Sequence, residues 1–146
     1  MNKLLIAGLA LTVLIACNKD KFQTKPQISI KDYNSKEISQ GGNLEVRLNY
    51  TDKEGDVGQG SFFGARLRQN IRPLALTDND QLDTLRYSLP EMPDIDKGVI
   101  VMKLDYNFLK ESLTENDTVV FKIAIKDRAG NASDTLTTDR LIIKKD

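Results

Sequence analysis

The sequence predicts one all-β sandwich domain of about seven strands. Three observations carry this prediction. Short runs in which apolar and polar residues alternate are separated by Gly, Pro, Asn and Asp, as in half-buried antiparallel strands joined by turns. Helical periodicity is almost absent, and the chain contains no internal repeat. With 146 residues and one cysteine, the chain is long enough to fold on an apolar core without disulfides.

The clearest strand lies in residues 44–50. There Leu44, Val46 and Leu48 alternate with charged or polar neighbours, so one face is expected to point into the core. The other strands are expected from similar runs bounded by turn residues. The seven expected strands span residues 26–33, 44–50, 62–68, 81–89, 98–104, 118–126 and 134–144.

Four later segments carry more specific expectations. Gly98–Leu104 (GVIVMKL) is apolar at most positions, so this strand is expected to be buried on both faces and central in its sheet. Residues 107–113 are expected to form a single helical turn that crosses between the sheets. A turn is expected at Asp127–Asn131, and Leu141 and Ile143 are expected to face inward.

A hydrophobic segment opens the chain. After Lys3, residues 4–16 are apolar except for Gly8 and Thr12. These thirteen residues would rise about 20 Å as a helix, which is less than the ~30 Å hydrocarbon core of a bilayer. That length is typical of the hydrophobic region of a signal peptide. Residues 1–16 are therefore interpreted as a cleaved signal peptide that takes no part in the fold.

The hydrophobic segment ends in Leu14-Ile15-Ala16-Cys17, which contains the single cysteine of the chain. This run resembles the lipobox of bacterial lipoproteins. The resemblance implies that the Cys17 thiol is diacylated, that the peptide is cut just before it, and that the new amine is acylated too. Two or three acyl chains hold a protein on a membrane durably. The alternative is an ordinary signal peptide, or a retained anchor, with a cysteine at its end by chance.

Residues 17–25 are interpreted as a lipidated tether, and residues 26–146 as the folded domain. The Lys19-Asp20 pair resembles the charged export signals of surface lipoproteins in Bacteroidota, although those signals carry more acidic residues. A solvated linker is the alternative. The expected location is the outer membrane of a bacterial cell, and the sequence leaves open whether the domain faces the periplasm or the cell surface.

Two loops resemble those of immunoglobulin-like modules. Ile125–Thr135 (IKDRAGNASDT) is similar to the last hairpin of many bacterial immunoglobulin-like domains. Tyr50–Gly58 (YTDKEGDVG) is similar to the loop after the second strand in such modules of Bacteroidota lipoproteins. Together with the seven short strands, the resemblance implies a sandwich of the immunoglobulin or fibronectin type III kind. The Trp and the paired cysteines of antibody domains are absent, so the strand order stays open.

One acidic loop is a candidate metal site. Asp52, Glu54 and Asp56 stand at alternate positions of a Gly-rich loop, and carboxylate oxygens are the ligands that Ca²⁺ prefers. An EF-hand is excluded, because Val57 stands where its loop needs Gly and Phe63 stands where it needs a bidentate Glu.

Residues from a second loop are expected to join this site. In an immunoglobulin-like sandwich the loops after the second and sixth strands lie at the same end, which would bring Asp127 and Asn131 close to Asp52–Asp56. Four carboxylates so placed would repel one another unless a cation, or Lys53 and Arg128, screened them. The alternative is a pair of ordinary turns, which Asp, Asn and Gly favour.

Composition excludes several classes of function. Without residues 1–16, which carry only Lys3, the chain has 20 basic and 21 acidic side chains and no basic stripe for nucleic acid. It has no histidine, and Cys17 is the one thiol, so Ser-His and Cys-His catalysis are excluded and no enzyme is expected. The expected partners are the membrane, through lipidated Cys17, and an unidentified envelope protein or surface ligand. No cofactor is required, and Ca²⁺ is the one candidate ion.

The sequence therefore predicts a lipid-anchored envelope lipoprotein with a non-catalytic binding, scaffolding or accessory role. The alternative is a Ca²⁺-stabilised ligand-binding β-sandwich that uses the Asp52–Asp56 loop.

Overall fold

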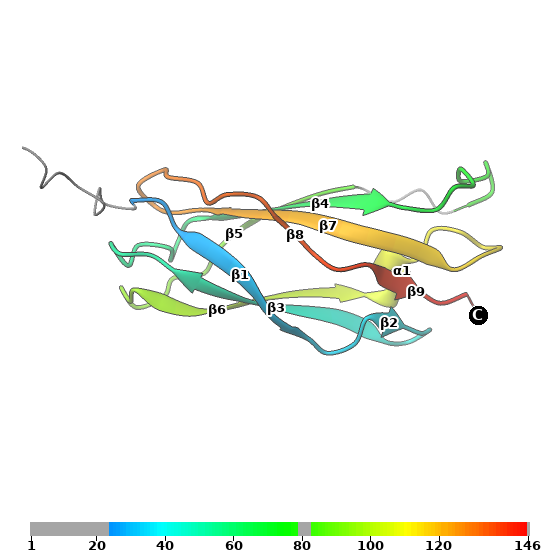
Figure 1. Ribbon diagram of the computed structural model, residues 1–146, viewed down its shortest axis with the longest axis horizontal. Coiled ribbons are helices and arrows are strands. Elements are labelled where there is room, and N and C mark those ends of the chain that lie inside the picture. The colour runs from blue at the N-terminus through cyan, green and yellow to red at the C-terminus, as the bar shows by residue number, and fades with distance from the viewer. Residues whose placement is uncertain (1–23, 79–82, 146) are drawn as a thin grey trace, which may run out of the picture.

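Residues 24–78 and 83–145, the part described by this computed structural model, form two β-sheets that pack face to face (Figure 1). The three-stranded sheet has the order β1 (Gln27–Tyr33), β3 (Asn43–Thr51), β6 (Lys97–Asp105). The six-stranded sheet has the order β2 (Glu37–Ile38), β9 (Leu141–Ile143), β7 (Asp117–Lys126), β4 (Ser61–Arg68), β5 (Thr84–Ser88), and β8 (Leu136–Thr137) also pairs with β7. The prediction of an all-β sandwich is confirmed, and the immunoglobulin-like class stays a prediction.

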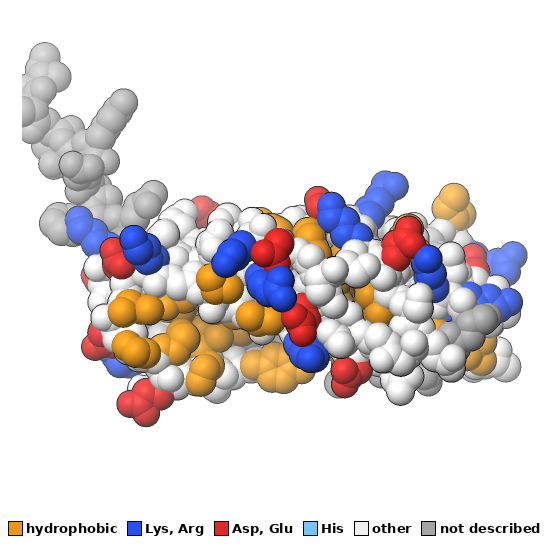
Figure 2. All heavy atoms as spheres, turned by 90° about the horizontal axis from the view of Figure 1, so that it is seen from below, with side chains coloured by type: hydrophobic (Ala, Val, Ile, Leu, Met, Phe, Trp, Pro, Cys, Tyr) orange, Lys and Arg blue, Asp and Glu red, His pale blue; other side chains and the backbone are white. Residues whose placement is uncertain are grey.

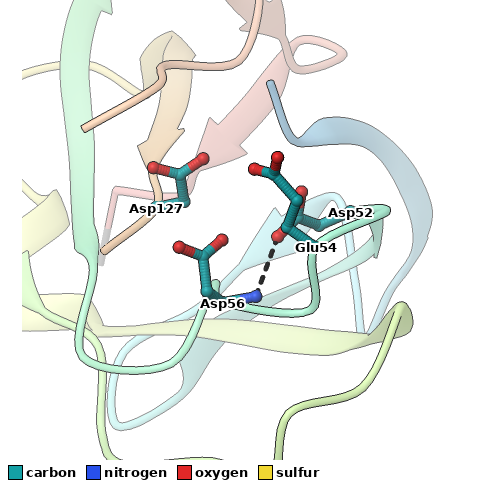
Figure 3. Close-up of side chains that lie close together, drawn as sticks. All are labelled: Asp52, Glu54, Asp56 and Asp127. Carbon is teal, nitrogen blue, oxygen red and sulfur yellow. Dashed lines mark hydrogen bonds between the residues drawn. The ribbon is translucent and has the colours of Figure 1, made fainter. Parts of the chain in front are cut away.

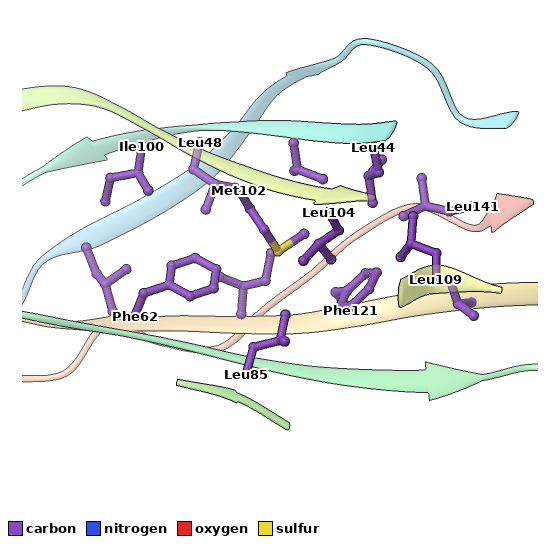
Figure 4. Packing of buried hydrophobic residues seen from close by; sticks show 14 of the residues in the cluster. Leu44, Leu48, Phe62, Leu85, Ile100, Met102, Leu104, Leu109, Phe121 and Leu141 are labelled. Atoms are coloured by element: carbon purple, nitrogen blue, oxygen red, sulfur yellow. The ribbon is translucent and has the colours of Figure 1, made fainter. Parts of the chain in front are cut away.

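The core fills the space between the two sheets. In β3 every second residue from Leu44 to Tyr50 is buried, and in β7 the same holds from Val119 to Ile125. This follows from the period of two in a strand, which sends alternate side chains to one face. Figure 4 shows side chains of both sheets meeting between the layers, with Phe121 and Leu104 near the middle. The core comprises twenty buried hydrophobic side chains of the described residues, from Ile38 to Ile143.

The strand count differs from the prediction. Two very short strands, β2 and β8, bring the number to nine in the described residues. The strand expected over residues 134–144 is divided into β8 and β9, which both pair with β7. Between them the hydroxyl of Thr138 accepts the amide hydrogen of Phe121, and the Thr138 amide donates to the Phe121 carbonyl. The Thr138 side chain therefore replaces a backbone carbonyl as the acceptor for the Phe121 amide, which interrupts the regular pairing with β7.

The expectation that Gly98–Leu104 is a central strand is wrong. These residues belong to β6, which ends the three-stranded sheet and pairs only with β3. Ile100, Met102 and Leu104 point into the core, whereas Val99 and Val101 are 43% and 51% exposed on the outer face. Because its exposed outer face is also apolar, this strand has the same sequence pattern as a strand buried on both faces.

The single helical turn, α1 (Tyr106–Leu109), lies at one end of the sandwich and connects β6 to β7 across the two sheets, as expected. In the described part of the chain, no helix is long and apolar enough to cross a membrane.

A buried ionic network surrounds Asp117, just after α1. One carboxylate oxygen of Asp117 accepts hydrogen bonds from Lys110 Nζ and from the backbone amides of Glu111 and Ser112, each at 2.9 Å, and the other accepts one from Arg68 Nε at 2.9 Å. The side chain is fully buried. This network joins β4 to the segment between α1 and β7.

The opposite end of the sandwich gathers the start of β1 and two long loops. Gln27 pairs with Thr51, and Ser61 pairs with Lys126, so the β3–β4 and β7–β8 loops leave the sheets at the same end. Lys25 Nζ contacts Asp134 Oδ1 at 2.7 Å, so the chain that enters β1 also lies against the β7–β8 loop. The candidate metal site lies at this end.

Candidate metal centre

The β3–β4 loop is folded back on itself directly after β3. The amide of Asp52 donates to the carbonyl of Asp96 at 2.7 Å, and the amide of Gly55 donates to the carbonyl of Asp52 at 3.1 Å. Gly55 has a φ of +72°, and a Cβ there would come within 3.1 Å of the Ile95 backbone nitrogen. Glycine is therefore needed both for the positive φ and for the close approach of the segment before β6.

The structure brings four carboxylates together, as expected if the loops after the second and sixth predicted strands lie at the same end of the sandwich. Asp52, Glu54, Asp56 and Asp127 each offer one oxygen, and these four oxygens all lie within 4.8 Å of one another. Figure 3 shows the side chains converging from the two loops. Asp52 and Asp127 are 2% and 4% exposed, Asp56 is half-buried, and Glu54 is exposed. The cluster thus has a buried floor and one side open to solvent.

Backbone amides satisfy only part of this oxygen set. Asp52 Oδ2 accepts the amide hydrogen of Asp56 at 3.0 Å, and Asp56 Oδ2 accepts that of Ala129 at 3.1 Å. Asp52 Oδ1 and Asp56 Oδ1 are buried and have no hydrogen-bond partner. A buried carboxylate oxygen without a partner is strongly unfavourable. These two oxygens are therefore the ligand atoms of the cluster that no protein group occupies.

Asn131, the fifth residue of the predicted site, donates hydrogen bonds to Asp127. Its side-chain amide donates to Asp127 Oδ2 at 3.0 Å, and its backbone amide donates to Asp127 Oδ1 at 2.7 Å. These bonds close the predicted turn at Asp127–Asn131 and fix the Asp127 carboxylate in position. Whether Asn131 itself binds a metal stays a prediction.

The electrostatics of the cluster oppose ionisation. Burial raises the pKa of Asp52 above its ordinary value, and the nearby charges of Asp56 and Asp127 raise it further, although the Asp56 amide acts in the other direction. Burial also raises the pKa of Tyr50, with smaller contributions from Asp52 and Asp96. The guanidinium of Arg128, named with Lys53 as the alternative to a cation in screening the cluster, pairs with Asp94 at 3.4 Å.

The residues fit a hard divalent cation. All four candidate ligands are carboxylates, and Ca²⁺ binds six to eight oxygens in flexible geometry, whereas Mg²⁺ demands a near-ideal octahedron. Zn²⁺ and Cu²⁺ sites use His or Cys, and neither type stands in this cluster. The open side next to Glu54 leaves room for water or another oxygen ligand.

Asp52→Asn is expected to change how the stability of the metal-free protein depends on pH. Because the folded-state pKa of Asp52 is raised, its protonated form favours the fold, and that stability is lost as pH rises from about 3.8 through the folded-state pKa. The variant does not lose this stability. In chelator, the free energy of unfolding of Asp52→Asn minus that of the wild type should therefore increase as pH rises to 7. Urea unfolding between pH 3.5 and pH 7 measures the difference. A constant difference over this range would contradict the assignment.

Sequence reasoning missed two features of this site. The Asp96 carbonyl that positions Asp52 comes from the segment before β6, and its participation depends on how that segment packs on Gly55. The burial of Asp52 also has no signal in the sequence, because the exposed Glu54 occurs in the same acidic pattern.

The sequence matches no protein-family model, and it resembles no curated protein at a significant level. The functional argument therefore depends on the residues themselves.

Proposed function

We propose that this protein is a lipid-anchored, non-catalytic β-sandwich module of a bacterial cell envelope. The observation that carries the proposal is the run Leu14-Ile15-Ala16-Cys17, which places the single cysteine directly after a signal-peptide-like segment. The expected role is binding, scaffolding or support of an envelope partner. The absence of histidine from the sequence agrees with a role that needs no general base near neutral pH.

The position of Lys25 adds a spatial consequence to this proposal. Lys25 lies at the same end of the sandwich as the acidic cluster, and Cys17 precedes it by eight residues. Eight residues span at most about 28 Å when fully extended. An anchor at Cys17 would therefore keep the candidate metal site close to the membrane surface and direct α1 and the Asp117 network away from it.

Cys17→Ser is expected to abolish lipidation. With the thiol removed, no acyl chain can be attached and the cut before residue 17 is lost, so the chain should lose its radiolabel when cells grow with labelled palmitate and should keep residues 1–16. Ser29→Ala, an exposed change on β1, serves as the control and should leave both readouts unchanged. A wild-type chain that takes up no palmitate label, or a Cys17→Ser chain labelled as strongly as the wild type, would contradict the lipid anchor.

A second function is favoured by a separate observation: the domain binds Ca²⁺ at Asp52, Glu54, Asp56 and Asp127. The two buried oxygens without partners, Asp52 Oδ1 and Asp56 Oδ1, support this proposal. A bound cation would satisfy both, cancel the repulsion within the cluster and connect the β3–β4 loop to the β7–β8 loop. The domain would then be a Ca²⁺-stabilised binding module, the alternative expected from the sequence.

Isothermal titration calorimetry tests the Ca²⁺ proposal. We expect one Ca²⁺ per chain at pH 7, and no binding to Asp52→Asn, which retains the side-chain volume but removes the charge. Asp134→Asn is the matched control: Asp134 lies in the β7–β8 loop, its side chain is 80% exposed, and it is not part of the cluster. Equal heats from Asp52→Asn and the wild type would overturn the assignment.

A further inference from the structure

β6 is a long strand with one free edge. It pairs with β3 without a shift in register, from Lys97 opposite Thr51 to Asp105 opposite Asn43. β1, the other edge strand of the same sheet, is interrupted by a register shift between residues 30 and 32. Such a bulge makes an edge a poor template for another strand. β6 has no such bulge, and no strand of the described residues pairs with its outer edge.

An apolar groove follows this free edge. It has a volume of about 490 Å³ and lies between β6 and the end of β5, and its lining includes Val99–Leu104, Tyr87–Pro90 and Met92. This side of the sandwich is therefore open between the two sheets. On the outer face of the sheet, exposed hydrophobic side chains gather beside a band of charged ones, as Figure 2 shows. Val99 and Val101 are among the exposed apolar residues.

Ion pairs on the outer face of the sheet show which charged side chains of β6 already have partners. Lys103 contacts Glu45 at 3.2 Å, Glu45 contacts Arg47 at 3.2 Å, and Arg47 contacts Asp32 at 2.7 Å. Lys103 is thus paired within its own sheet. The charged residues at the two ends of β6, Lys97 and Asp105, form no ion pair within the described residues at 4.0 Å or less.

The sequence of β6 is complementary to a second, antiparallel copy of itself. Two β6 strands that pair about a two-fold axis at Val101 place Lys97 of each copy opposite Asp105 of the other. At the axis the two Val101 side chains meet on the outer face. On the inner face Ile100 of one copy lies opposite Met102 of the other. Opposite charges therefore meet at both ends of the strand pair, and apolar side chains meet in its middle.

We infer that this protein forms a two-fold symmetric dimer through β6. The two three-stranded sheets join into one six-stranded sheet, and the inward side chains of each β6 cover the mouth of the groove of the other copy. A symmetric interface uses the same patch on both chains, so it requires a patch complementary to itself. The Lys97 and Asp105 pairing meets this requirement. The inference is independent of both the lipid anchor and the metal centre.

Sedimentation velocity at increasing protein concentration tests the dimer. The chain from Thr24 to Asp146 is suitable, because it contains the entire core described above. We expect a reversible dimer whose association constant falls at least ten-fold in Lys97→Asp, because two pairs of like charges then face each other. The double variant Lys97→Asp/Asp105→Lys restores the opposite charges and should recover the association. Ser29→Lys, on the β1 edge, is the control and should leave it unchanged.

Three results would overturn the inference. One is a monomer at every concentration, as expected if the groove instead receives an extended peptide from another protein. Another is a double variant that associates as weakly as Lys97→Asp, although both variants remain folded by circular dichroism. The last is a dimer that Ser29→Lys weakens as much as Lys97→Asp. Hydrogen exchange gives an independent readout: amides of residues 99–103 on the free edge should exchange more slowly as the dimer forms.

Discussion

Asp117→Ala is expected to cause the largest loss of stability of any single change considered. Asp117 is fully buried and accepts four hydrogen bonds, from Lys110, Arg68 and two backbone amides. Removing it leaves the buried Lys110 without its carboxylate partner, whereas Arg68 keeps Glu115 at 2.7 Å. Breaking a buried ion pair from one side costs about 3–5 kcal/mol. For a domain of this size, that corresponds to a melting temperature lower by about 12–20 °C.

Thermal and urea unfolding of Asp117→Ala and Asp32→Ala provide the measurement and its control. Asp32 also pairs with an arginine, at 2.7 Å, but its side chain is 44% exposed. Exposed pairs contribute about 0–1 kcal/mol, so Asp32→Ala should change the free energy of unfolding little. Similar losses in the two variants would show that burial of the Asp117 network does not determine its contribution.

The Asp117 network also predicts an acid limit to stability. Burial by itself would raise the pKa of Asp117, but Lys110, the Glu111 amide, Arg68 and the Ser112 amide together hold it below its ordinary value. A lowered pKa contributes stability that is present above the unfolded-state value of about 3.8 and is lost as pH falls through the folded-state pKa. The difference in free energy of unfolding between the wild type and Asp117→Ala should therefore become smaller below pH 3.8.

Saturating Ca²⁺ is expected to have the second largest effect and to raise the melting temperature by about 10 °C at pH 7. A ligand at 100 times its dissociation constant stabilises the folded state by about 2.7 kcal/mol. That energy corresponds to about 10 °C for a domain of this size. Because extracellular Ca²⁺ modules bind with dissociation constants of about 10⁻⁴–10⁻³ M, about 10 mM CaCl₂ is a suitable concentration.

Differential scanning calorimetry measures this effect against two controls. MgCl₂ at the same concentration should raise the melting temperature less, because its octahedral geometry fits a cluster of flexible loop carboxylates poorly. Asp52→Asn should show no Ca²⁺-dependent rise, whereas Asp134→Asn should rise like the wild type. A wild-type melting temperature that is identical in CaCl₂ and in chelator would contradict a stabilising metal centre.

Much of the architecture was predictable because strand periodicity depends on local sequence. The alternation from Leu44 to Tyr50 gives the buried face of β3 directly. The proximity of Asp127 to Asp52 was also predictable, since it depends only on which strand ends share one end of a sandwich. The separation of β8 from β9 was not predictable, because it depends on a hydrogen bond from the Phe121 amide to the Thr138 hydroxyl.

Other features depend on long-range packing and leave little mark in the sequence. Val99 and Val101 look like core residues, yet they are exposed because β6 is the last strand of its sheet. Asp117 begins a strand predicted to start at Thr118, and its four hydrogen bonds come from β4 and the segment after α1. The two buried oxygens of the acidic cluster likewise emerge only when the β3–β4 and β7–β8 loops pack together.

The most direct test of the metal centre is a crystal structure of the protein grown with CaCl₂, with anomalous scattering recorded to locate Ca²⁺. We expect one anomalous peak between the β3–β4 and β7–β8 loops, with Asp52 Oδ1 and Asp56 Oδ1 among its ligands at about 2.3–2.6 Å. Crystals saturated with Ca²⁺ that show no peak there, or only a water at hydrogen-bond distance from these two oxygens, would contradict the assignment.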